Sequence, residues 1–98
     1  MRRAIVLRRP GTCTDEIDEL TARHDLTVVF TVTAETTHPR LAVMIAVEHA
    51  LDHLAEVVLV PWLTAQDIWA GREWLALAEF WDLIGGDGPI ATAEFVRP

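Results

Sequence analysis

A chain of 98 residues and 11.0 kDa is long enough for one domain with a single core, and it contains no serine, lysine, tyrosine or asparagine. These absences remove most side chains used in covalent catalysis and leave one cysteine, four histidines, fifteen carboxylates and eight arginines. The net charge of −7 and the isoelectric point near 4.9 argue against direct binding of duplex DNA, which needs clustered basic side chains.

The first third of the chain predicts a strand, a helix and a second strand. Arg3 to Arg8 is a short apolar run that ends at Pro10-Gly11, as expected of a buried strand. Thr14 precedes a group of acidic residues that suits the first turn of a helix, which we expect to run to about His24. Leu26 to Val32 is rich in β-branched residues and is the second predicted strand.

The rest of the chain continues the alternation of helices and strands. Residues 36–39, with a proline in the opening turn, begin a helix that we expect to run to about Leu54. Val57 to Val60 is a β-branched strand, and Ala65 to Ile84 is predicted to be a third helix. Pro89 to Val96 is predicted to be the last strand.

Uninterrupted apolar strands are typical of a parallel sheet covered by helices on both faces. We therefore expect an α/β fold: a three-layer sandwich with a mainly parallel four-stranded sheet, the order β-α-β-α-β-α-β and a Rossmann-like or flavodoxin-like winding. No apolar run approaches the roughly 20 residues that cross a bilayer, so we expect no membrane contact. With one cysteine and no secretory signal, we expect a cytoplasmic location. Nothing indicates a cofactor.

Arginines, a hydroxyl and a thiol gather where the first predicted strand ends. Arg8 and Arg9 are followed by Thr12 and Cys13, and His38 follows the second predicted strand. Ligands of α/β folds bind at the carboxyl ends of strands. Two interpretations stay open: a site for an anionic small molecule with Cys13 or His38 as the reactive group, or solvated arginines at a strand end.

Two histidines one helical turn apart, His49 and His53, project from one face of the second predicted helix. Such a pair can bind a metal ion if a third ligand converges on it, but Ala50 replaces the glutamate of the metalloprotease pattern. The alternative is that both face solvent, because they lie opposite an apolar face. That face comprises Leu41, Met44, Val47, Leu51 and Leu54.

The third predicted helix is apolar around almost its whole circumference. A helix of this kind is buried on more than one side. We expect one side to pack on the sheet and the other to meet a second subunit, where tryptophan is favoured; the alternative is a deeply packed core helix. The candidate interface residues are Trp69, Trp74, Leu77, Phe80 and Trp81.

Three fragments, Val6–Pro10, His38–Leu41 and Val57–Thr64, follow one another as do three motifs of a known family. With the element order, they resemble the N-terminal catalytic domain of serine recombinases, the resolvase and invertase family. The resemblance implies a serine nucleophile where this chain has Pro10. Of the family's active-site arginines only Arg8 has a counterpart, so the resemblance implies a degenerate domain without recombinase activity.

Composition and resemblance together predict a function based on contacts rather than catalysis. We expect residues 1–98 to form one resolvase-like α/β domain that acts through protein contacts as a homodimer. A mean hydropathy of +0.24 is high for a domain this small and favours apolar surface left for a partner. The alternative is a small ligand-binding protein or enzyme that uses the strand-end site around Arg8, Arg9, Cys13 and His38.

Overall fold

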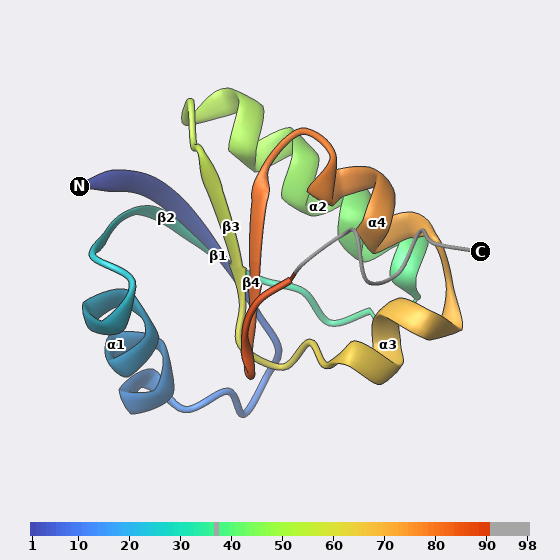
Figure 1. The fold of residues 1–98 in the computed structure, drawn as a ribbon, viewed down its shortest axis with the longest axis horizontal. Coiled ribbons are helices and arrows are strands. Elements are labelled where there is room, and N and C mark those ends of the chain that lie inside the picture. Colours follow the sequence, from blue (N-terminus) through green and yellow to red (C-terminus); the bar gives the residue numbers. More distant parts are fainter. Residues whose placement is uncertain (37, 91–98) are drawn as a thin grey trace.

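The computed structural model describes residues 1–36 and 38–90, without the side chains of residues 69 and 70. Within these ranges a five-stranded sheet has the order β2-β1-β3-β4-β5 (Figure 1). β1 to β4 run parallel, and β5 is antiparallel to β4. In chain order the elements are β1 (Arg2–Arg8), α1 (Thr14–Arg23), β2 (Leu26–Thr33), α2 (Pro39–Asp52), β3 (Val57–Val60), α3 (Ala65–Ala70), α4 (Glu73–Ala78), β4 (Asp82–Gly85) and β5 (Gly88–Pro89).

The two central strands are buried on both faces. Ala4 to Leu7 in β1 and Val57 to Val60 in β3 are all 0% exposed. Alternate residues of each strand join two different core clusters, one on each face of the sheet. This double burial explains why both strands are apolar without interruption.

Helices cover both faces of the sheet (Figure 1). α1 covers one face with its buried residues Ile17 and Leu20. α2, α3 and α4 cover the other face, where Ile68, Trp74 and Leu77 belong to the core cluster. The predicted α/β class, mainly parallel sheet and helical layers are confirmed. In the described ranges no helix has both the length and the apolar composition to cross a bilayer.

The predicted helix from Ala65 to Ile84 is wrong in two respects. It is interrupted at Gly71, whose extended backbone (φ −161°, ψ 171°) separates α3 from α4. Beyond residue 78 the helix ends, and residues 82–85 form β4, whose Leu83 and Ile84 enter different core clusters. A strand buried on both faces is as apolar all round as a buried helix, so the pattern does not separate the two.

The sheet therefore has five strands in the described residues, where four were predicted. The additional strand, β4, occupies the place that the sequence assigns to the end of a helix. β5 follows it after a tight turn, and Gly88 adopts a φ of +114° that residues with a side chain rarely adopt. Of the predicted last strand, Pro89 lies in β5, whereas residues 91–96 lie outside the described part of the chain.

Candidate functional site

A sharp turn directly after β1 fixes the positions of two arginines. The backbone N–H of Arg9 donates to Oγ1 of Thr12, and the backbone N–H of Thr12 donates to the carbonyl of Arg9, both at 3.0 Å. Gly11 lies between them at a φ of +90°, which favours glycine. Nη2 of Arg8 donates to the Thr12 carbonyl at 2.7 Å. Three of the residues predicted for an anion site therefore lie together.

Arg9 also lies over a tryptophan from the neighbouring strand. Its Cζ atom is 3.7 Å from the centre of the Trp62 ring, a cation–π distance. Trp62 follows β3, and its Nε1 donates to the carbonyl of Leu7 in β1 at 3.1 Å. The indole is thus held across the ends of two adjacent parallel strands. Sequence reasoning missed Trp62; its only signal is an aromatic residue just after a buried strand.

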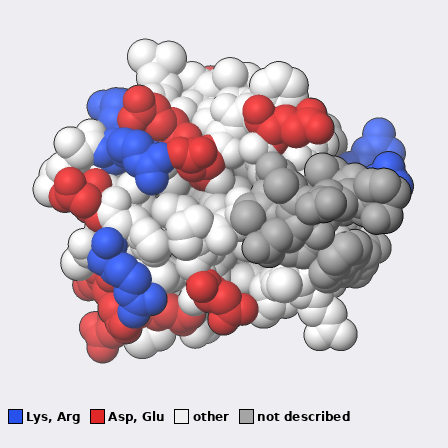
Figure 2. Space-filling model, viewed as in Figure 1, with Lys and Arg blue, Asp and Glu red and all other residues white. Residues whose placement is uncertain are grey.

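Arg8 and Arg9 make no ion pair among the residues that the structure describes. The ion pairs found there join Arg2 and Arg23 to carboxylates. On the face drawn in Figure 2, arginine side chains lie beside aspartate and glutamate side chains rather than in one basic patch. Within residues 1–36 and 38–90, no bonded carboxylate neutralises the positive charge at the end of β1.

Cys13 and His38 do not form a pair. Both side chains are exposed; Cys13 is the N-cap of α1 and His38 is the N-cap of α2. The two helices cover opposite faces of the sheet (Figure 1), and no hydrogen bond joins these side chains in the described ranges. A nucleophile with a hydrogen-bonded base is therefore not assembled at these two positions.

His49 of α2 and His53, the C-cap of that helix, are half-buried, so the prediction that they face solvent is wrong. The rings of His49 and His53 both stack on Phe30 of β2, with centroid distances of 4.7 and 4.4 Å. Their faces thus complete the apolar cover of the sheet instead of converging on an ion. Across the described part of the chain, no group of three or more metal-ligating side chains gathers.

The residues predicted as an interface on the third helix divide between core and surface. Trp74 and Leu77 are each 2% exposed, so the structure corrects the interface prediction there: both side chains lie in the core of the chain itself. Trp81 is half-buried, and its Nε1 donates to a backbone carbonyl in the loop before β3 at 3.0 Å. Phe80 is 77% exposed. The side chain of Trp69 lies outside the described residues.

α2 faces the sheet with its smallest side chains. The alanines that face the sheet are Ala42, Ala46 and Ala50, which are at most 1% exposed. The larger apolar residues Leu41, Met44 and Leu51 point outward and are 50, 58 and 60% exposed. A repeat of alanine every four residues lets the helix lie close to the sheet. Of the apolar face seen on the helical wheel, Val47 packs against the core, and the other four residues lie on the surface of the chain.

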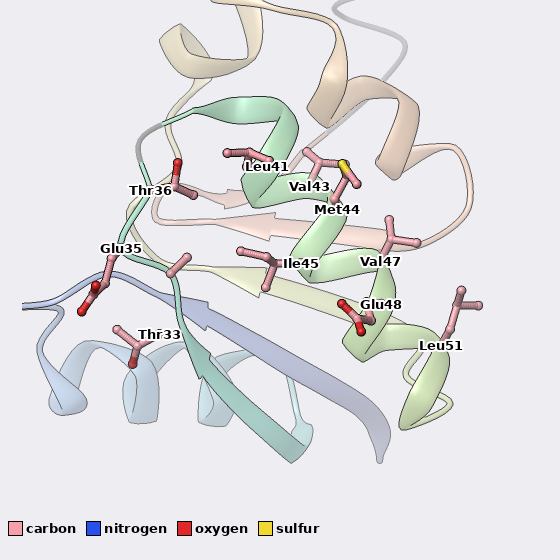
Figure 3. Close-up of a pocket in the computed structure, with 11 residues that line it drawn as sticks. Thr33, Glu35, Thr36, Leu41, Val43, Met44, Ile45, Val47, Glu48 and Leu51 are labelled. Atoms are coloured by element: carbon pink, nitrogen blue, oxygen red, sulfur yellow. The ribbon is translucent and has the colours of Figure 1, made fainter.

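Open grooves border the outward face of α2. One of about 940 Å³ lies between α2 and residues 33–36, which include the last residue of β2; Figure 3 shows Leu41, Met44 and Leu51 following one another along the helix. Another of about 520 Å³ lies between α2 and α4, and Leu51 and Phe80 line it. We define Leu41, Met44, Leu51 and Phe80 as the α2 patch.

A comparison of the chain with models of known protein families and with curated proteins finds no match. What the chain does is therefore inferred from two features of its own geometry: the α2 patch and the arginines at the end of β1.

Proposed function

We propose that the chain is a non-catalytic domain that acts through protein contacts and forms a homodimer through the α2 patch. The supporting observation is the orientation of α2, which leaves leucine and methionine side chains 50 to 60% exposed in one row. Single exposed apolar residues are common on proteins, but contiguous ones mark interaction sites. Their contact with a partner removes apolar surface from water.

The size of the α2 patch fits the centre of a dimer interface. At their exposed fractions of 50 to 77%, the four side chains offer roughly 400 Å² of apolar surface. A standard interface buries about 800 Å² on each partner, of which somewhat more than half, or about 450 Å², is apolar. The patch therefore supplies most of the apolar area that one partner needs.

The spacing along α2 favours a second copy as that partner. The exposed row consists of Leu41, Met44, Glu48 and Leu51, with intervals of three, four and three residues. This spacing is symmetric about its midpoint, so an antiparallel two-fold arrangement brings Leu41 opposite Leu51 of the second copy. It also brings Met44 opposite Glu48 of the second copy, whose methylene groups can cover the thioether while the carboxylate reaches water. Such a self-complementary surface is what a two-fold dimer requires.

The resemblance to the serine-recombinase catalytic domain is part of the same proposal. It is supported by the parallel strands β1 to β4 and by the arginine at the end of β1. Where the family has its nucleophile, Pro10 lies exposed in the turn after β1. Because the chain has no serine, the attacking hydroxyl that the family uses for strand transfer is missing, and we propose that the domain retains a role in assembly.

Native mass spectrometry and light scattering at tens of micromolar protein test the proposal. We expect the wild type at twice 11.0 kDa and the Met44→Glu variant at 11.0 kDa, because a carboxylate at the centre of the patch opposes burial. Ala22→Glu makes the same charge change on an exposed site of α1, in the opposite layer, and is expected to stay dimeric. Circular dichroism establishes that each variant is folded.

A monomeric wild type would refute the homodimer. A folded Met44→Glu variant that stays dimeric would show that the copies meet elsewhere. Loss of the dimer in both variants would point to a general effect of the added negative charge rather than to this patch.

A further inference from the structure

We infer that the ends of β1 and β3 form a binding site for a small oxyanion, a phosphate or carboxylate group, held by the guanidinium of Arg9 on Trp62. β1 lies between β2 and β3, and the chain reaches these neighbours through helices on opposite faces of the sheet (Figure 1). In open α/β sheets, ligands bind outside the carboxyl ends of the strands at such a switch point. Arg9 follows β1 there, and Trp62 follows β3.

The strongest observation is a set of hydrogen-bond donors without acceptors. The Nε atoms of Arg8 and Arg9 are buried, and neither has a partner in the described part of the chain. A buried charged donor without a partner destabilises the protein, and native structures rarely leave one unsatisfied. Glu35, the carboxylate that follows β2 at the same edge, is exposed and makes no ion pair with either arginine. Because neighbouring atoms cover both Nε atoms, an external oxyanion that satisfies them must shift the arginine side chains as it binds.

The arrangement around Arg9 favours an oxyanion over other ligands. A guanidinium is a planar fork of N–H groups that matches the paired oxygens of a carboxylate or phosphate. Trp62 covers one face of the group at 3.7 Å and limits its freedom, so less entropy is lost when the fork binds. The hydroxyl of Thr12 accepts from the Arg9 backbone and keeps its own hydrogen for an acceptor.

Titration at constant ionic strength tests the site. Inorganic phosphate and acetate are added separately, with chloride as the balancing anion, while amide and indole N–H signals are followed by nuclear magnetic resonance. We expect saturable shifts of the Trp62 indole signal and of the Arg9 to Thr12 amides with at least one of the two anions. Saturation by phosphate alone assigns a phosphate site, and saturation by acetate alone assigns a carboxylate site.

Three variants distinguish specific binding by the guanidinium group of Arg9 from a general attraction of the anion to positive charge. Arg9→Gln is expected to weaken the anion roughly tenfold or more, because the charged donors are lost. Arg9→Lys keeps the charge without the fork and is expected to bind more weakly than the wild type. Arg23→Gln removes the same charge at the end of α1 and is expected to bind like the wild type.

Two results would overturn this site. One is the absence of saturable shifts with either anion in the folded wild type. The other is equal binding by wild type and Arg9→Gln, with circular dichroism establishing that the variant is folded. The titration does not depend on the oligomeric state, so the site can fail while the homodimer stands, or the reverse.

Discussion

The orientation of α2 predicts that shortening an exposed methionine destabilises the protein less than enlarging a nearby buried alanine. Met44→Ala shortens a side chain that is 58% exposed, whereas Ala46→Leu enlarges one that is 0% exposed. A helical wheel that places the large residues in the core predicts the opposite order. The two substitutions therefore test which face of α2 contacts the sheet.

The structure sets the size of each effect. Complete burial of a methionine stabilises by about 1.5–3 kcal/mol, so the two fifths of Met44 that is buried contributes about 1 kcal/mol. The higher helix propensity of alanine offsets a few tenths of a kcal/mol of this loss. Met44→Ala is therefore expected to lower the free energy of unfolding by about 1 kcal/mol or less. Ala46→Leu adds three carbons where the helix lies on the sheet, and overpacking of this kind costs about 1–3 kcal/mol.

Urea denaturation followed by circular dichroism measures both free energies of unfolding. Each variant is unfolded at two protein concentrations, because a change with concentration isolates the contribution of dimerisation. A cost of about 2–5 kcal/mol for Met44→Ala is what a core methionine gives. That result, with a neutral Ala46→Leu, would refute the orientation of α2 and with it the α2 patch.

Two further substitutions test the elements that follow β3. Trp74→Ala is expected to lower the free energy of unfolding by about 3–5 kcal/mol in urea denaturation, since the side chain is 2% exposed; a cost below about 1 kcal/mol would place it at a surface. Thr64→Ala removes the capping box in which Thr64 and Asp67 satisfy each other's backbone N–H groups at the start of α3. The loss of this cap is expected to lower the free energy of unfolding by about 1 kcal/mol, which lowers the melting temperature by about 4–8 °C. An unchanged melting temperature in thermal denaturation would contradict the cap.

The elements best predicted from the sequence are those whose hydrophobic pattern fits only one kind of secondary structure. The β-branched run at Val57 to Val60 has the composition of a strand buried on both faces, and it forms β3. The pattern fails where two structures share it. Leu83 and Ile84 are apolar neighbours in either a buried helix or a central strand, and their choice depends on pairing with β3, which the local sequence does not contain.

In the candidate site too, the local features were predicted from the sequence and the contacts between distant residues were not. The turn that joins Arg9 to Thr12 is local, and its residues were found from the sequence. The contact between Arg9 and Trp62 joins residues 53 positions apart and depends on the adjacency of β1 and β3. The orientation of α2 was missed because leucine and methionine outweigh alanine on a hydropathy wheel, whereas the close approach of helix and sheet selects the small residues.

The order of strands in the sheet also determines the order in which their backbone amides become accessible to solvent. β3 is paired on both sides and fully buried, so its amides exchange with solvent only when the sheet itself separates. β2 lies at an edge of the sheet formed by the described residues, where every second backbone N–H points away from β1 and pairs with no strand of that sheet. Hydrogen exchange is therefore expected to begin at the edge strands β2 and β5 and to reach the central strands β1 and β3 last, so this small chain loosens from the edges of its sheet while the centre holds.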